Sequence, residues 1–241
     1  MTFYLTCRTR RLRVYDPATL DSVIATLATG AELRLTGTAF ERAAVCVNGG
    51  TGREVAGTWS ASLEWLVSRL APGFPGLGLA EVRYRIKSWR RLDLCVEDAL
   101  AAIEAVVEAG AAEVALLGFS MGGAVALGAA AHPAVTTVVG LAPWLPDRLP
   151  VSGLDGRRLV VFHGGLDRWL PGIPGVHPRS SRRGFERAVE RGVEASYTLI
   201  PGAVHGLAVR APWGGVVPLL RAGRWAEHVA AELERFQASA A

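Results

Sequence analysis

The chain has 241 residues, half of them apolar, and a formal net charge of +4 whose positive side chains are arginines except for Lys87. A chain of this length buries roughly 70–75% of its unfolded surface, which is enough for one core, so we expect a single domain over residues 1–241. It has no signal-peptide pattern, no apolar run near the ~20 residues that span a bilayer, and three widely spaced cysteines, so we expect a cytoplasmic protein without disulfides or membrane contact.

The first quarter of the chain is predicted to form a strand, a helix and two further strands. Residues 3–14 alternate apolar and polar side chains, as a strand does. The Asp-Pro pair at residues 16–17 supplies an N-cap and a first-turn proline for a helix that ends at Gly30. Strands are then predicted at Glu32–Thr36 and Ala43–Val47, and the second is apolar throughout, as a strand buried on both faces is.

From residue 60 onward, helical patterns alternate with apolar runs. The spacing of apolar residues predicts helices over residues 63–70, 96–110, 185–191 and 225–236. Short apolar runs predict strands at residues 81–86, 114–117, 135–141, 158–162 and 195–200. This alternation argues for an α/β fold with a parallel sheet covered by helices on both faces.

Ser120 stands between two glycines at the end of an apolar run, and a stretch rich in small residues follows it. When a buried strand passes directly into a helix, the corner residue is forced into a strained, often positive-φ conformation that holds its side chain above the sheet. Gly118 and Gly122 leave room for this turn, because a Cβ at either position would collide with a neighbouring strand or helix. The pattern therefore predicts that Ser120 is a nucleophile with the positive end of a helix aimed at it.

Three other polar segments follow predicted strands: residues 48–52, Asp167 and His205. In a doubly wound sheet, reactive groups gather at the carboxyl ends of the strands, so we expect these segments to meet Ser120 there. A serine hydroxyl needs a base to remove its proton, a histidine suits that task near neutral pH, and a carboxylate holds the ring in the right tautomer. Ser120, Asp167 and His205 supply one of each and are predicted as the catalytic residues.

This order, together with the serine corner and the successive strand ends, resembles the α/β-hydrolase family, whose triad runs nucleophile, acid, histidine along the chain. The resemblance covers the chain from about residue 43 to the C-terminus and implies the α/β-hydrolase fold, with a mostly parallel central sheet and helices on both faces. Many members carry a helical cap between the strand after the nucleophile helix and the strand that bears the acid. Here that interval, residues 142–157, is short, so we expect a minimal cap. The chain looks most like small capless esterases and the dienelactone-hydrolase-like group, which commonly has cysteine where this chain has Ser120.

The oxyanion that forms when a serine attacks a carbonyl needs two backbone donors. One is expected from the amide of Met121, next to the nucleophile. The other is expected from residues 48–51, Asn-Gly-Gly-Thr, which resemble the family's His-Gly-x loop with asparagine in place of histidine. That alignment makes Gly50 the donor, and Gly49 and Thr51 are the alternatives.

The acid and the histidine each have competitors. Asp147 is the alternative acid, since some members of the family draw the acid from the loop after the preceding strand. His177 is the weaker rival of His205, and His163, which follows a strand end and precedes two glycines, is interpreted as structural. The remaining two histidines are interpreted as solvated side chains: His132 and His228.

No metal, nucleotide or other cofactor is predicted, because the chain has no Cys-x-x-Cys, no His-Glu-x-x-His and no phosphate-binding loop. The arginine clusters lack the interleaved aromatics of a nucleic-acid groove, so no nucleic-acid partner is expected. The expected partner is a small-molecule acyl substrate. Three tryptophans in predicted loops near the site are expected to wall its pocket: Trp144, Trp169 and Trp213.

The predicted activity is that of a serine hydrolase, which cleaves a carboxylic ester or thioester through an acyl-enzyme. An acyltransferase would use the same residues with an alcohol or amine in place of water, and the sequence does not separate the two. A non-catalytic ligand-binding protein on the same fold is the remaining alternative, and the presence of all three reactive residues argues against it. The sequence indicates no oligomeric state.

Overall fold

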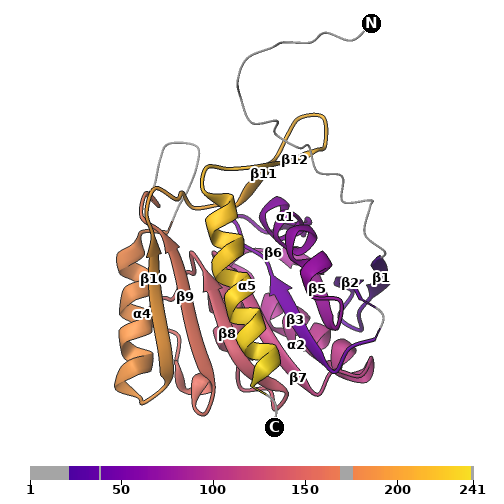
Figure 1. The fold of residues 1–241 in the computed structure, drawn as a ribbon, viewed down its shortest axis with the longest axis horizontal. Coiled ribbons are helices and arrows are strands. Elements are labelled where there is room, and N and C mark those ends of the chain that lie inside the picture. The colour runs from indigo at the N-terminus through magenta and orange to yellow at the C-terminus, as the bar shows by residue number, and fades with distance from the viewer. Residues whose placement is uncertain (1–21, 38, 169–175, 240–241) are drawn as a thin grey trace, which may run out of the picture.

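The computed structural model describes residues 22–37, 39–168 and 176–239. Within these ranges the centre of the molecule is an eight-stranded sheet in the order β1-β2-β5-β3-β7-β8-β9-β10 (Figure 1). The strands from β5 to β10 in this order are parallel, while β2 is antiparallel to β5 and to β1. The predicted α/β fold with a mostly parallel sheet is confirmed. The strands have these bounds: β1 Ser22–Thr26, β2 Glu32–Thr36, β3 Arg42–Val47, β5 Leu77–Arg83, β7 Glu113–Phe119, β8 Val135–Leu141, β9 Arg158–Gly164 and β10 Glu194–Ile200.

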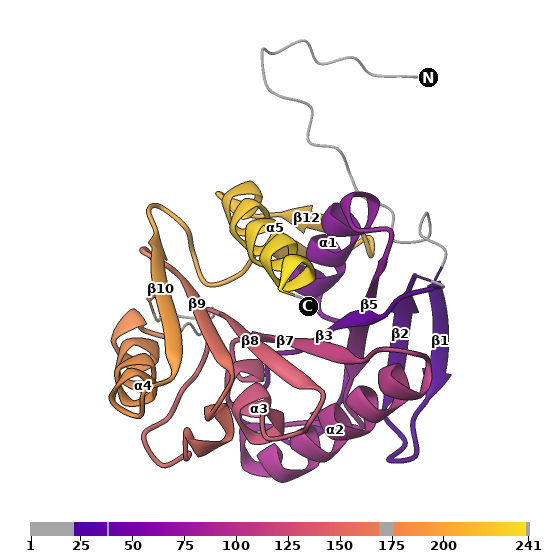
Figure 2. The same ribbon diagram turned by 60° about the horizontal axis from the view of Figure 1, so that its bottom comes forward.

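Helices cover both faces of the sheet (Figure 2). One face carries α2 (Leu92–Glu108), α3 (Gly122–Ala129) and α4 (Pro178–Glu190), and the other carries α1 (Ala61–Leu70) and α5 (Ala222–Ala238). Each face has its own apolar core. Successive residues of β3 enter the two cores in turn, which is why this strand is apolar throughout. No helix in the described ranges is long and apolar enough to cross a membrane.

Two small two-stranded sheets were not predicted. In one, β4 (Val55–Ala56) pairs with β6 (Ile86–Lys87), and in the other, β11 (Ala208–Arg210) pairs with β12 (Val216–Pro218). Three short 3-10 helices were also missed: residues Ala71–Gly73, Trp89–Arg91 and Ser152–Leu154. The second of them begins two residues after β6 ends. Lys87 of β6 and Trp89 of this 3-10 helix line the candidate site described below.

The helix predicted to run to Gly30 is wrong for the described part of that segment. Residues Ser22–Thr26 form β1, which turns back through Gly30 (φ 87°) and pairs antiparallel with β2. Val23 and Ile24 are β-branched and favour this extended conformation, although both are exposed. The strand predicted at residues 3–14 and the Asp-Pro pair at 16–17 lie outside the described residues.

Several element boundaries also differ from the prediction, and two elements, β5 and α4, show why. The strand predicted at residues 81–86 begins earlier and ends earlier, as β5. Its Gly78 resembles a loop residue in sequence, but a Cβ there would lie 2.8 Å from the Phe40 ring, so the glycine belongs to the packed strand. Helix α4 begins seven residues before the predicted 185, because His177 caps it by accepting a hydrogen bond from the Arg179 amide (3.1 Å) and Pro178 opens its first turn.

Candidate active site

The serine corner has the backbone that the sequence predicts. Ser120 has a φ of 56°, and it lies between the end of β7 and the start of α3. A Cβ on Gly118 would lie 2.4 Å from Gly122 O, and one on Gly122 would lie 2.2 Å from Val47 O. The turn is therefore possible only with glycine at both positions, and it holds the Ser120 side chain at the carboxyl edge of the sheet.

The structure brings Asp167 and His205 to the same place. His205 Nε2 lies 3.0 Å from Ser120 Oγ, and His205 Nδ1 lies 2.7 Å from Asp167 Oδ2. If Nδ1 carries the ring proton and donates it to the carboxylate, Nε2 is left to accept the Ser120 hydroxyl. The ring also packs against Phe119, with centroids 5.3 Å apart. The three residues thus form a continuous hydrogen-bonded arrangement in which the hydroxyl faces a base.

The loops after β9 and β10 are joined by backbone hydrogen bonds. Gly165 N donates to Ile200 O (2.9 Å), and Leu166 N donates to Ala203 O (2.9 Å). A Cβ on Gly164 would lie 2.6 Å from Ala203 O, so the two loops approach as closely as glycine allows. This packing sets the position of Asp167 relative to His205.

The Asp167 side chain is fully buried, and its Oδ2 is within hydrogen-bond distance of two histidine rings, His205 and His163 (2.9 Å). Burial works to raise the pKa of this carboxyl, but the hydrogen bonds from His163 and His205 outweigh it and hold the pKa below its ordinary value. Asp167 is therefore a carboxylate at neutral pH, as the orientation of His205 requires.

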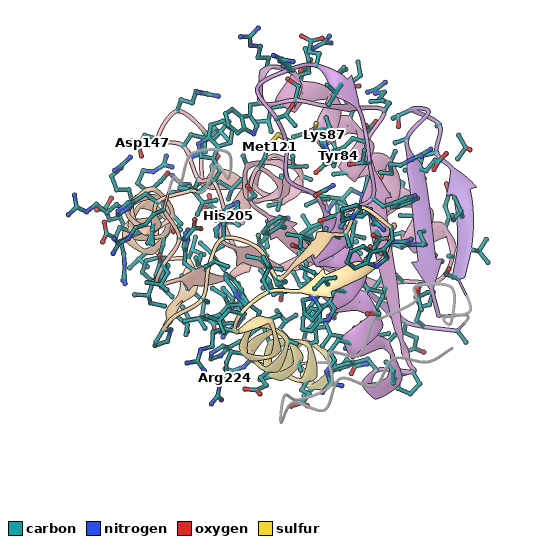
Figure 3. All side chains as sticks on the ribbon, turned by 90° about the horizontal axis from the view of Figure 1, so that it is seen from above. Tyr84, Lys87, Met121, Asp147, His205 and Arg224 are labelled. Atoms are coloured by element: carbon teal, nitrogen blue, oxygen red, sulfur yellow. The ribbon has the colours of Figure 1, made fainter. Side chains whose placement is uncertain are left out.

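The alternative acid and the other histidines lie away from Ser120 or have other hydrogen-bond and packing partners. Asp147 is exposed and pairs with Arg183 of α4 (3.3 Å), and Figure 3 shows it at the edge of the molecule, away from His205. His177 is near the site, but its Nδ1 caps α4. The two histidines predicted to be solvated are each partly buried: His132 pairs with Glu104 (2.9 Å), and His228 stacks on Phe162.

The backbone donors expected for an oxyanion are next to the serine. Within the described residues, the amides of Gly50 and Met121 make no hydrogen bond, while the Gly49 amide donates to Asn48 Oδ1 (2.6 Å). A Cβ on Gly50 would lie 2.1 Å from Met121 Sδ, so these two residues are in direct contact. Thr51 does not line the cavity in front of Ser120, whereas Gly50 does. The geometry thus favours Gly50 over its two neighbours.

Asn48 stands where the His-Gly-x loop of the α/β-hydrolase family has histidine, and it anchors the loop that contains Gly49 and Gly50. Its Nδ2 donates to Thr58 O (3.0 Å), and its backbone carbonyl accepts a hydrogen bond from the buried Tyr84 hydroxyl (3.1 Å). The Asn48 side chain thus connects the end of β3 to the chain beyond β4. The asparagine therefore supplies an anchor for the glycine loop.

A cavity of about 530 Å³ opens in front of Ser120. Trp144 lines it, as predicted, and lies 6.2 Å from the Trp89 ring, centroid to centroid. Trp213 does not line it, because it is at the turn between β11 and β12 with 73% of its surface exposed, and Trp169 lies outside the described residues. The lining is formed by Asn48, Gly49, Gly50, Lys87, Trp89, Phe119, Ser120, Met121, Trp144, Val176, His177, Ser180 and His205.

Lys87 and Trp89 were missed as cavity residues. They follow the end of β5, a parallel strand, and therefore obey the same strand-end rule as the other site segments. Burial lowers the pKa of the Lys87 amine, whose Nζ donates to Thr58 Oγ1 (2.8 Å), and Figure 3 labels Lys87 close to Met121. The described residues contain no group of three or more His, Cys, Asp or Glu side chains that could hold a metal ion.

Solved structures share this fold. A putative α/β hydrolase of unknown function from Agrobacterium tumefaciens is 14% identical, with a TM-score of 0.67 over 90% of this chain and 96% of that one. The dienelactone hydrolase-like promiscuous phosphotriesterase P91 from metagenomic libraries is 16% identical, with a TM-score of 0.63 over 89% and 97%. An α/β serine hydrolase without a lid from Xanthomonas campestris is 16% identical, with a TM-score of 0.57 over 77% and 85%. No protein-family model and no curated protein matches the chain. At these identities the comparisons establish the α/β-hydrolase fold.

Proposed function

We propose that this protein, which has the α/β-hydrolase fold, is a serine hydrolase that cleaves carboxylic esters or thioesters through an acyl-enzyme. The observation that carries the proposal is the hydrogen-bonded series from Ser120 Oγ through His205 to Asp167, beside two backbone amides without partners in the described residues. Each group has one task in acyl transfer, and the distances are those at which a proton can pass.

In the proposed reaction, His205 Nε2 takes the proton of Ser120 as its Oγ attacks the carbonyl carbon. The amides of Gly50 and Met121 donate to the oxyanion, whose stabilisation is worth about 10²–10³ in rate for each donor. The protonated His205 then donates to the leaving oxygen or sulfur, and the acyl group stays on Ser120. Water attacks this acyl-enzyme with His205 as base, and the acid is released. Asp167 keeps the ring in the productive tautomer throughout.

The cavity supports a compact acyl substrate with an apolar or aromatic part. Trp89, Trp144 and Phe119 supply its aromatic walls, and Lys87 contributes a positive charge on one side. Between β8 and β9 the chain forms only the 3-10 turn Ser152–Leu154, so no helical cap arises from residues 142–157.

A fluorophosphonate probe tests the nucleophile directly. We expect covalent labelling of Ser120, loss of labelling in Ser120→Ala and strong loss in His205→Ala. Ser180→Ala is the matched control, because Ser180 also lines the cavity but its hydroxyl makes no hydrogen bond to a histidine ring within the described residues. Folded protein that stays unlabelled at Ser120, or labelling undiminished in His205→Ala, would contradict the proposal.

Substrate profiling then separates the alternatives. p-Nitrophenyl esters of increasing acyl length, with matched thioesters, measure which acyl groups the cavity accepts. Adding an alcohol or amine acceptor distinguishes hydrolysis from acyl transfer, because transfer yields a new ester or amide in place of the free acid. A labelled Ser120 with no turnover of any ester would leave a ligand-binding protein as the better interpretation.

A further inference from the structure

A second histidine reaches the carboxylate that orients His205. His163, at the end of β9, is fully buried, and its Nε2 lies 2.9 Å from Asp167 Oδ2. The same oxygen is 2.7 Å from His205 Nδ1. One carboxylate oxygen therefore has a ring nitrogen on each of two sides, only one of which the proposed reaction uses.

The partners of His163 determine where its proton lies. Its Nε2 faces two acceptors, Asp167 Oδ2 and the carbonyl of Val176 (2.8 Å), so this nitrogen must carry a proton. Its Nδ1 faces Ser181 Oγ at 2.8 Å, and a hydroxyl can donate to it. His163 can therefore stay neutral and still donate to the carboxylate.

The hydrogen bonds continue from His163 to the next elements. Ser181 Oγ, in the first half of α4, lies 2.9 Å from the hydroxyl of Tyr197 in β10. Burial raises the pKa of Tyr197, so this hydroxyl keeps its proton and can donate. Both hydroxyls also face the carbonyl of Pro178, at 3.0 Å from Ser181 Oγ and 3.2 Å from the Tyr197 hydroxyl. When Ser181 donates to His163 and Tyr197 donates to Ser181, the donors run in one direction, from Tyr197 to Ser181, to His163, and to Asp167.

Val176, one of the hydrogen-bond partners of His163, also lines the cavity. Val176, whose carbonyl accepts from His163, has its amide 3.5 Å from His205 Nδ1 and lines the cavity with His177. The charged and titratable groups around this network come from each packed element: Asp167 and His205 from the loops, Arg182 of α4 over the Tyr197 ring (4.0 Å), and Lys87 across the cavity.

We propose that His163 is a positioning residue that holds the Asp167 carboxylate through its Nε2 proton and thereby sets the pH range over which His205 acts as a base. The proposal rests on the proposed function only in assigning His205 as the base. A donor on Asp167 draws negative charge away from the side that faces His205. Without it, the full carboxylate charge would favour the protonated ring, and His205 would lose its proton at higher pH.

The first test compares the pH profile of kcat/KM for a p-nitrophenyl ester in His163→Leu and His163→Gln. Leucine removes the donor, so we expect the acid limb to move up by about one pH unit and kcat/KM at pH 6 to fall roughly 10-fold. Glutamine can place an amide N–H near the position of Nε2, so it should restore most of the profile. His132→Leu is the matched control, because it removes another histidine–carboxylate pair (2.9 Å, with Glu104) away from the cavity and should leave the acid limb unmoved.

The second test does not need turnover. In the Ser120→Ala protein, NMR titration of the histidine side chains should show His205 losing its proton at higher pH when His163→Leu is added. If His163→Leu fails to fold, Ser181→Ala replaces it, and the shift should have the same direction and a smaller size. An unmoved His205 titration in the variant that folds would overturn the proposal, even if the variant is less stable. A shifted titration in the Ser120→Ala background, together with a protein carrying Ser120 that hydrolyses no ester, would overturn the proposed function alone.

Discussion

Ser120 and Asp167 stand at the ends of two strands of one sheet, but different contacts hold them. The Ser120 amide donates to Leu141 O (3.0 Å), and its carbonyl accepts from the amides of Gly123 (3.0 Å) and Trp144 (2.7 Å). At Asp167 the backbone amide donates to Gly164 O (3.1 Å), while two histidine rings hold the carboxylate. Backbone hydrogen bonds place the proposed nucleophile, whereas two histidine side chains orient the carboxylate of the proposed acid.

This difference predicts how each region responds to amino-acid substitutions. The serine corner depends on having no side chain at two glycines that lie two residues on either side of Ser120 in the sequence. The acid depends on His163, His205 and Ser181, which come from a strand end, a second loop and a helix. Damage to the corner should therefore affect folding, and damage to the acid side should affect activity and its pH dependence.

Removal of the proposed nucleophile should give the largest effect. Ser120→Ala should lower kcat/KM for a p-nitrophenyl ester by roughly 10⁶-fold, because the acyl-enzyme has no other oxygen to form on. His205→Ala should cause a loss of the same order, and the double variant should add little, since the two residues act as a unit. Steady-state kinetics on all three variants measure this. Losses that multiply in the double variant would place Ser120 and His205 in separate roles.

The identity of the acid gives the next effect in size. Asp167→Asn should reduce kcat by roughly 10⁴-fold, because the amide would favour the wrong tautomer of His205. Asp147→Asn is the matched control and should change kcat less than about twofold, because Asp147 is exposed and paired with Arg183. Kinetics on both variants, with circular dichroism to check folding, decide between them. A large loss in Asp147→Asn with an active Asp167→Asn would reverse the assignment.

The serine corner should respond in stability. In Gly122→Ala the new Cβ would lie 2.2 Å from Val47 O, a backbone atom of β3 that has no room to move, so we expect a loss of about 3 kcal/mol in the free energy of unfolding. Gly52→Ala is the control, because a Cβ there meets nothing within 4 Å, and it should change stability by less than about 0.5 kcal/mol. Urea unfolding measures both. Equal stability of the two variants would show that the corner relaxes.

The same contrast explains which parts of the site the sequence could predict. Ser120, Asp167 and His205 each follow an apolar run directly, and parallel strands bring their carboxyl ends to one edge, so strand ends alone were enough to propose them. The contact of His163 with Asp167 could not be foreseen in this way. It involves Ser181 and a helix start set by the cap at His177 and by Pro178, and neither leaves a periodic pattern in the sequence.

The fold was predictable where burial leaves a recognisable pattern of apolar residues in the sequence. The parallel strands β3, β5, β7, β8 and β9 carry apolar runs because both of their faces are covered. In β1 every residue is exposed, so no burial pattern marks it, and its pairing with β2 is a contact that local propensity does not report. Lys87 and Trp89 were missed because they belong to the short strand β6 and the 3-10 helix after it, and neither element leaves a periodic pattern in the sequence.

The smallest predicted effect concerns acid stability on the side held by side chains. The folded-state pKa of Asp167 is lowered by the hydrogen bonds from His163 and His205 against the opposing effect of burial. Its carboxylate therefore adds stability that is fully present above the unfolded pKa of about 3.9 and is lost as pH falls through the lower folded value. In His163→Leu one of these hydrogen bonds is gone, the folded pKa of Asp167 moves back up, and this contribution should shrink and disappear at a higher pH. Urea unfolding between pH 6 and pH 3 measures the difference from the wild type. A constant difference across that range would mean that His163 stabilises the fold by packing alone and leaves the charge on Asp167 unaffected.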